Sequence, residues 1–437
     1  MSSVRNILRG RLAAKLLFLG MVFAVPLMLS IGAQAAAITH AVDPAHGEWY
    51  VNFIIDQAKE FYKQTGIQVN ISAVGDHRSQ ILVWAAGNAL PDAVDIVSDN
   101  GLLFFRAGLF LDLKDLFDQS TDIRLNDLLP IALSAFTAPE PYDIEPGAVF
   151  AFPYMLYNVN AAYNVRLLEN AGLPSPNTLG AGWNWDKAYE YAQKLTVDKN
   201  SDGKTDQWGL FMPRIMSRWG ILFRHAGNPI FDRDYDPTAV QLNTPAARQT
   251  LQWVVDMAQS GYIAWENWQF NEGRAVLSFN GASNIGMLMS RYNQEVDHIP
   301  FPYGPAGANG AEFQVFGTAI NKKSKNIDLT WQWLSFLWGD RDRIIAACKQ
   351  MVNVPALRSV ISIYDSQINT WTKHSQIVIE SANYKGSGLR PIVRDGRIGS
   401  TVEQTINQAL ALTMPLEQAL VEAQERTTAI LKEIFGR

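Results

Sequence analysis

The sequence is poor in cysteine and histidine and has no dense basic run. Cys348 is the only cysteine among 437 residues, which excludes an intramolecular disulfide and a site built from several thiolates. The 37 Lys and Arg are spread along a chain of net charge −5, so nucleic acid is not an expected partner. No H-E-x-x-H, G-x-S-x-G or G-x-x-x-x-G-K-S/T motif occurs, so metalloprotease, serine-hydrolase and P-loop ATPase functions lack support.

The composition that is present predicts a large folded protein. Hydrophobic residues make up 48% of the chain and aromatic residues 11%, which is enough to bury a sizeable core and excludes a disordered chain. At this length two domains are expected. The 13 Trp serve either to fill the core or to stack on flat ligands.

The N-terminus carries the pattern of an export signal. An apolar stretch over 16–31 is followed by small residues at 33–37, which suit a signal peptidase. The preceding basic residues are Arg5, Arg9, Arg11 and Lys15. A membrane anchor is the alternative, but Pro26 interrupts the apolar stretch, which is short for a span. We therefore predict a signal peptide at 1–37.

The same features predict a periplasmic protein. Cleavage near Ala37 leaves about 400 residues and removes four positive and no negative charges, which takes the net charge from −5 to −9. Cys348 is far from the cleavage region, so a lipid anchor at the mature N-terminus is not expected. No later apolar run is long enough to cross a membrane.

Hydrophobic periodicity predicts an α/β protein with a parallel sheet. Strands are expected at 38–42, 67–71 and 94–97, with helices at 49–63 and 79–87 between them. This alternation is typical of parallel sheets with right-handed crossovers. Ligands of such sheets bind beyond the carboxyl ends of the strands, so Asp99 and Asn100 are site candidates by position.

Two aromatic and proline-rich stretches predict crossings between two lobes. The first covers 152–163 and the second 299–305. Helices are expected at 186–194 and 244–260, and the tail over 400–437 is strongly helical. No internal repeat is present.

Four segments give the chain a resemblance to a known family. They are Phe152-Pro153-Tyr154 with Ala162-Tyr163-Asn164 and Ala171-Gly172-Leu173-Pro174, the acidic turn over 198–209, Phe270-Asn271-Glu272-Gly273-Arg274-Ala275 with Asn280-Gly281, and Gly317-Thr318-Ala319-Ile320 with Trp333-Leu334-Ser335-Phe336-Leu337. In this order they resemble the extracellular solute-binding proteins of ABC importers, family 1, the maltose-binding-protein-like, sugar-binding branch.

The resemblance implies a periplasmic-binding-protein type II fold: two discontinuous α/β lobes joined by a hinge, with the ligand cleft between them. Lobe 1 is expected at 38–153 plus 302–345, and lobe 2 at 154–301 plus 346–437. The resemblance also implies a sugar ligand and docking on the membrane permease subunits of an ABC importer. We expect a monomer that needs no cofactor.

The candidate ligand contacts each have an ordinary structural alternative. The family's first-lobe loop supplies an acidic contact where Asp99 and Asn100 stand, although both residue types also favour helix N-caps. Tyr154 and Tyr157 lie on the first crossing, where they either face the ligand or pack in the hinge. Arg390 follows a flexible loop and either reaches the ligand or is a solvated charge.

Stacking residues are harder to place. Trp49 and Trp219 are candidates, and packing in the core or on the surface is the alternative for both. The family has a stacking tryptophan just after Asn280-Gly281, but this chain has Ala282, Ser283 and Asn284 there, and Ser283 and Asn284 are the candidate ligand contacts at this place. This departure argues against an oligosaccharide stacked as in the maltose protein.

The acidic turn matches most of a calcium loop. The expected ligands are the side chains of Asp198, Asn200, Asp202 and Asp206 and the carbonyl of Lys204. Gly209 stands where a bidentate Glu would complete the shell. The alternative to a structural Ca²⁺ is an Asx-rich turn without metal.

The sequence therefore predicts a periplasmic substrate-binding component of an ABC transporter that captures a mono- or oligosaccharide and is not an enzyme. The alternatives are a binder of a polyol or glycerol phosphodiester, an exported polysaccharide-degrading enzyme that uses a carboxylate pair, and a sensory or adhesion module.

Overall fold

The computed structural model describes residues 36–121, 123–139, 145–281, 293–351, 353–368 and 372–436. Residues 36–437 form one compact unit. Most of the predicted signal peptide, residues 1–35, lies outside the described residues. None of the helices in the described ranges combines the length and the apolar composition needed to span a bilayer.

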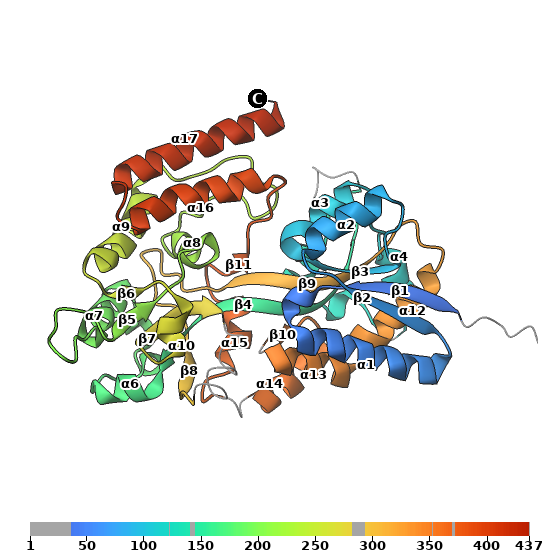
Figure 1. Cartoon of the computed structure of the whole chain (residues 1–437), viewed down its shortest axis with the longest axis horizontal. Helices are drawn as coiled ribbons and strands as arrows, with labels where there is room; N and C mark the ends of the chain where they lie inside the picture. Colours follow the sequence, from blue (N-terminus) through green and yellow to red (C-terminus); the bar gives the residue numbers. More distant parts are fainter. Residues whose placement is uncertain are drawn as a thin grey trace, which may run out of the picture. The chain divides into compact units, whose positions relative to one another are not determined.

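The N-terminal part has the predicted alternation of strands and helices (Figure 1). Its sheet consists of β1, β2 and β3, with β1 between the other two and parallel to both. The elements are β1 (Ala37–Val42), α1 (Glu48–Thr65), β2 (Gln68–Ala73), α2 (His77–Ala86), β3 (Ala93–Val97), α3 (Ser98–Arg106), α4 (Lys114–Gln119) and α5 (Pro130–Ala135). The strands and helices expected up to residue 97 are all confirmed, with ends that differ by one or two residues.

Two long antiparallel strands join the N-terminal part to the rest of the sheet. They are β4 (Phe152–Asn164) and β9 (Glu312–Ile320), and β9 also pairs with β3. Nearly every residue of β4 is buried, because the strand is covered on both faces. The full strand order is β2-β1-β3-β9-β4-β7-β5-β6. The predicted crossing at 152–163 is therefore a continuous strand.

The middle of the chain builds the second part of the sheet around β7, which is antiparallel to β4 and parallel to β5. Its elements are α6 (Val165–Asn170), α7 (Trp185–Leu195), β5 (Trp208–Phe211), α8 (Met216–His225), α9 (Pro245–Gln259), β6 (Ile263–Ala264), α10 (Asn267–Asn271), β7 (Ala275–Gly281) and β8 (Val296–Ile299). Side-chain caps fix the helix starts: Asn184 accepts the Lys187 N–H before α7, and Thr244 accepts the Ala247 N–H before α9.

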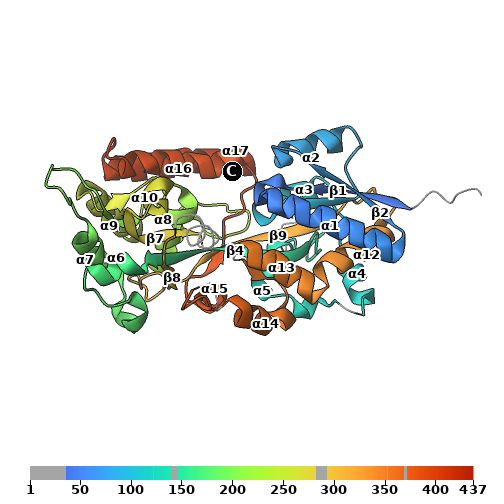
Figure 2. The same cartoon turned by 60° about the horizontal axis from the view of Figure 1, so that its bottom comes forward.

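The C-terminal region packs against both the N-terminal part and the second part of the fold. It contains α12 (Ile327–Trp338), α13 (Arg341–Met351), β10 (Val354–Pro355), α14 (Arg358–Ile368), α15 (Ile377–Glu380), β11 (Gly388–Leu389), α16 (Gly396–Leu410) and α17 (Leu416–Phe435). Helices α12 and α13, in orange, lie on the same side as α1 in Figures 1 and 2. Helices α16 and α17 pack against each other and against α9.

Buried side chains form two large cores. The first core takes residues from 38–156 and 311–392, and the second core takes residues from 159–301 and 398–431. The first core thus includes buried residues between Ala347 and Ile392, whereas lobe 1 was predicted to end at residue 345. The return crossing also comes later in the chain than predicted. The backbone of Tyr303 bonds to Trp183 and that of Ala306 to His225, so both residues still belong to the second part. The chain returns to the first part through β9.

A buried carboxylate ties together the elements beside the first crossing. Asp95 in the middle of β3 accepts hydrogen bonds from Tyr50 Oη (2.9 Å) and Thr318 Oγ1 (2.9 Å), and its Oδ1 lies 3.0 Å from His40 Nε2. Burial opposes ionisation, but His40 holds the pKa of Asp95 below its usual value. The Asp43 N–H also points to Asp95 (3.3 Å), so this cluster fixes the β1–α1 loop next to the start of α3.

A glycine allows α7 to lie directly on β5. A Cβ at Gly209 would stand 2.0 Å from the Ala192 carbonyl oxygen. Since the obstacle is backbone, we expect Gly209→Ala to lower the free energy of unfolding by about 1–3 kcal/mol in chemical denaturation. Gly182→Ala, in open space, is the matched control and should change it little. Equal stability of the two variants would contradict the close approach.

Candidate ligand-binding site

The first candidate residues follow directly after β3. Asp99 lies in the first turn of α3, where it accepts a hydrogen bond from Gln314 Nε2 of β9 (2.8 Å) and keeps a third of its side chain exposed. The neighbouring Asn100 instead accepts the Val97 N–H through Oδ1 (3.4 Å). Asn100 thus serves as the third residue of a capping box whose N-cap is Val97, while Asp99 contacts β9 and stays partly exposed.

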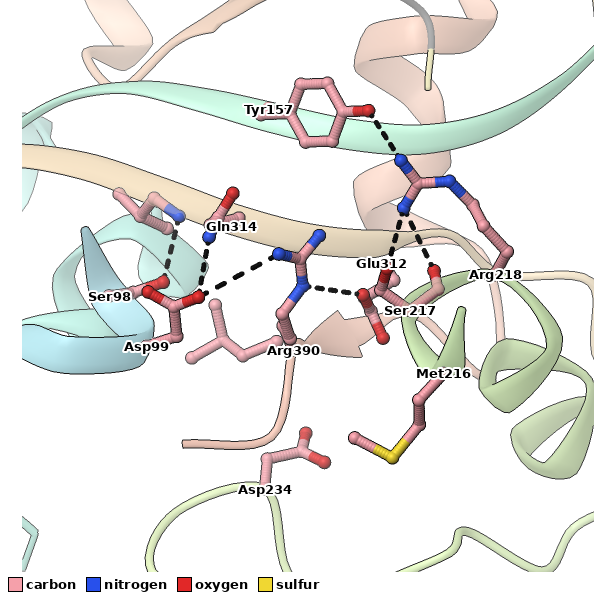
Figure 3. A network of polar contacts seen from close by, with 12 residues as sticks. Ser98, Asp99, Tyr157, Met216, Ser217, Arg218, Asp234, Glu312, Gln314 and Arg390 are labelled. Carbon is pink, nitrogen blue, oxygen red and sulfur yellow. Dashed lines mark hydrogen bonds and ion pairs between the residues drawn. The ribbon is translucent and has the colours of Figure 1, made fainter. Parts of the chain in front are cut away.

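A buried guanidinium links three elements at the second half of the crossing. Arg218 of α8 donates from Nε to Asn280 Oδ1 of β7 (2.6 Å) and from Nη2 to Tyr157 Oη of β4 (3.0 Å), as Figure 3 shows for the tyrosine. Its Nη1 donates to the hydroxyl and carbonyl of Ser217. Burial lowers the pKa of Arg218, since every partner that accepts its hydrogen bonds is neutral.

Tyr157 occupies space that is free only because residue 281 is a glycine. A Cβ at Gly281 would stand 1.7 Å from Tyr157 Oη. The Asn280-Gly281 pair therefore supplies both a hydrogen-bond acceptor for Arg218 and room for the Tyr157 ring. Tyr157 is half-buried and packs against both cores.

Arg390, from the C-terminal region of the chain, contacts two acidic residues. Its Nε donates to Glu312 Oε1 at the start of β9 (3.1 Å), and its Nη1 lies 3.9 Å from Asp99 Oδ2 (Figure 3). Burial opposes its charge, but Glu312 and Asp99 raise the pKa of Arg390. The predicted residues Asp99 and Arg390 thus share one polar group with Glu312, and Tyr157 shares a second with Arg218. The charges of Glu312 and Arg390 act on Arg218, so the two groups together are treated as one polar network. Planar amide, carboxylate and guanidinium groups of this kind suit a ligand rich in hydroxyls.

A cavity of about 180 Å³ adjoins this network. Arg390 and Glu312 form one wall, and the start of α8 forms another. In Figure 3, Met216 and Asp234 lie on the cavity side of Arg390. A larger groove of about 760 Å³ runs along α1 and β2, and none of the predicted binding residues lines it.

Two predicted aromatic contacts are packed inside the protein. Tyr154 is fully buried, with its ring 4.0 Å from that of Trp338 and its hydroxyl 2.9 Å from Tyr50 Oη. Trp219 is equally buried and packs in the second core beside Phe223. Because a fully buried ring offers no surface to a ligand, the packing alternative describes both, and the predicted ligand contacts are corrected.

The remaining predicted contacts are placed less centrally. Trp49 is half-buried, contacts Tyr50 edge to face and packs against the first core, so its position fits the packing alternative. Ser283 and Asn284 lie outside the described residues.

The predicted calcium loop is tied by its own backbone. Asp198 accepts the N–H groups of Asn200, Asp202 and Gly203, and Asp202 accepts that of Lys204. Asp206 accepts the Lys199 N–H across the turn. Across the described ranges, no group of three or more His, Cys, Asp or Glu is arranged to hold a metal ion. The contacts are those of an Asx-rich turn, and calcium binding stays a prediction.

Four residues of the network were not predicted as site residues: Arg218, Asn280, Glu312 and Gln314. A signal for two of them exists, because Glu312 and Gln314 alternate with apolar residues in an otherwise hydrophobic strand and so share a face. Arg218 is next to the candidate Trp219, and Asn280 belongs to a segment that carries the family resemblance. No local sequence pattern shows that their side chains meet.

A two-part α/β fold crossed by long strands, with a polar network and a cavity at the crossing, defines a binding protein of the periplasmic type II class. The chain belongs to the bacterial extracellular solute-binding proteins, whose family profile matches residues 45–343. The resemblance seen in the sequence and the predicted fold class are both confirmed.

Solved structures agree on the fold. An ABC substrate-binding protein from Listeria monocytogenes in complex with cycloalternan matches with a TM-score of 0.74 and 21% identity, covering 92% of this chain and 99% of that one. The cyclic α-maltosyl-1,6-maltose binding protein from Arthrobacter globiformis gives 0.74 and 19%, covering 91% and 99%. The maltose/maltodextrin-binding domain MalE from Bdellovibrio bacteriovorus, bound to maltotriose, gives 0.70 and 19%, covering 91% and 100%.

Proposed function

We propose that this protein captures a sugar in the periplasm and delivers it to the permease of an ABC importer, without changing it chemically. The observation that carries the proposal is that two polar groups, Arg218 with Tyr157 and Arg390 with Asp99 and Glu312, are coupled through their charges and draw on elements of both cores. Membership of the solute-binding family and the saccharides bound by three similar proteins support it.

The network suits a mechanism in which the ligand joins the two parts of the fold. Asp99 comes from an element of the first core, while Arg218 comes from an element of the second core. A sugar with hydroxyls on opposite edges bonds to both groups at once, and the conformation in which both contacts exist is stabilised over one in which only one exists. We propose that the loaded, bridged conformation, as a monomer, is the one that docks on the permease subunits.

A thermal-shift screen of mono- and oligosaccharides, polyols and glycerol phosphodiesters tests this proposal. Binding stabilises the folded state by RT ln(1 + [L]/Kd), so a true ligand at about 100 Kd adds about 2.7 kcal/mol and raises the Tm clearly. We expect at least one sugar to do so and to be recovered intact after long incubation. Release of a cleaved product, or a Tm shift only with non-sugar compounds, would contradict the proposal.

A further inference from the structure

The cavity beside Arg390 has an unusual balance of charges. Its charged lining consists of three carboxylates and two guanidinium groups, contributed by Asp234, Glu312, Glu403, Arg224 and Arg390. Its volume of about 180 Å³ is below the roughly 300–1,000 Å³ of pockets that enclose a whole drug-sized ligand. It therefore has room for one polar substituent, or one edge of a ring, of a ligand held by the network.

Both cations of the lining are already bound to carboxylates. Arg224 Nη2 donates to Asp234 Oδ1 (2.8 Å) and also bonds to the Leu389 carbonyl, while Arg390 Nε donates to Glu312 (3.1 Å). Glu403 accepts the Met216 N–H at the start of α8 (2.7 Å), and no ion pair joins it to any residue in the described ranges. Counted over these five groups, the lining has an excess of one negative charge; Arg218, whose charge also acts on Glu312 and Arg390, is not part of the lining.

Asp234 is only partly removed from water, with 41% of its side chain exposed. The pocket removes water from its carboxylate, and this raises the pKa of Asp234 even though Arg224 acts in the opposite direction. The ionised carboxylates of the lining are hydrogen-bond acceptors only. A hydroxyl or ammonium group satisfies them, whereas a carboxylate or phosphate brings a second anion into a partly dehydrated space.

We propose that this cavity is a charge filter: it accepts hydroxyl and ammonium substituents of the ligand and rejects anionic ones. The proposal rests on the sugar-binding function above and narrows its substrate class to neutral and amino sugars. Uronic acids, sugar phosphates and glycerol phosphodiesters are excluded, and the residue that sets the excess charge is Glu403.

Calorimetric titration with matched sugars tests the filter. In the gluco, galacto and manno series, and with the disaccharides maltose and chitobiose, each neutral or amino sugar is compared with the uronic acid or the 6-phosphate of the same stereochemistry. In the series that binds, we expect the anionic member to bind at least about tenfold more weakly than the neutral one. An anionic sugar that binds as tightly as its neutral counterpart, or more tightly, would overturn the filter.

Removing the charge of Glu403 tests whether the difference in affinity between neutral and anionic sugars arises in this cavity. In Glu403→Gln the side-chain oxygen still accepts the Met216 N–H, so the fold is kept while the charge is removed. We expect the gap between neutral and anionic sugars to shrink about tenfold in this variant. Glu425→Gln, an exposed carboxylate of α17, is the matched control and should leave the gap unchanged. An unchanged gap in Glu403→Gln refutes the filter; failure of every sugar to bind the parent protein refutes the sugar-binding function itself.

Discussion

Arg218→Ala is expected to weaken sugar binding by about 100-fold or more. The substitution removes the group that holds Tyr157 Oη and Asn280 Oδ1, and it leaves both buried polar atoms without the donor they face. Truncating one member of a buried, charge-assisted hydrogen-bond network at a binding site typically costs about 2–5 kcal/mol. The loss should appear in the Kd from calorimetric titration with the sugar that raises the Tm most.

Two further variants show that geometry, and not charge alone, causes this loss. Arg218→Lys keeps the positive charge but cannot serve Asn280, Tyr157 and Ser217 at once, because an ammonium lacks the planar fork of a guanidinium. We expect it to remain at least about tenfold weaker than the parent. Arg214→Ala removes a nearby arginine that stacks on Trp265 instead, and should bind normally. Normal binding by Arg218→Ala would refute the role of the network.

The order of secondary structure could be predicted from the sequence wherever the pattern is local. The strands β1, β2 and β3 and helices α1 and α2 were all found, because alternation and helical periodicity depend on residues close in the chain. The helices α7 and α9 were found for the same reason, and their caps at Asn184 and Thr244 mark their starts.

The lobe boundaries depend on which distant segments pack together, and the boundary predicted at residue 345 differs from the division between the two cores. Residues 346–392 look like a continuation of the C-terminal helices, yet Cys348, Val354 and Tyr364 are buried in the first core. The cause is β10, which pairs with β4 and holds this segment beside the first crossing. No local periodicity encodes a pairing across some 200 residues.

The candidate site also contains some residues that local patterns predict and others that depend on contacts between distant segments. Asp99 could be predicted because loops after parallel strands form sites, and Arg390 because it follows a flexible loop. Tyr154 and Tyr157 were predicted together, but Tyr154 stands at an irregularity of β4 and lies against Trp338, whereas Tyr157 lies against Arg218. The sequence gives the alternation and not which face is the site, and this explains why one prediction needed correction.

Acidification from pH 7 to pH 5 is expected to lower the free energy of unfolding by about 4 kcal/mol through two buried histidines. Burial lowers the pKa of His225 and of His298 from 6.5 to about 4. Arg224 acts in the same direction on His225, while the Gly310 carbonyl that lies 2.8 Å from its Nε2 opposes it; Asp297 opposes and His374 adds to the shift of His298.

The sign follows from where each state binds protons. Between pH 6.5 and pH 4 the unfolded chain protonates both imidazoles and the folded protein does not, so stability is complete above pH 6.5 and falls as the pH drops toward 4. Each pKa unit corresponds to about 1.4 kcal/mol, which gives about 2 kcal/mol for each histidine at pH 5.

Urea unfolding at a series of pH values measures this loss, and His298→Leu isolates one half of it. Among the residues that the structure describes, neither ring nitrogen of His298 has a hydrogen-bond partner, so leucine removes the titrating group without breaking a described side-chain contact of that kind. We expect the variant to lose about 2 kcal/mol less than the parent between pH 7 and pH 5. If both proteins lose the same amount, His298 is not held neutral by the fold, and the acid sensitivity has to come from groups other than this one.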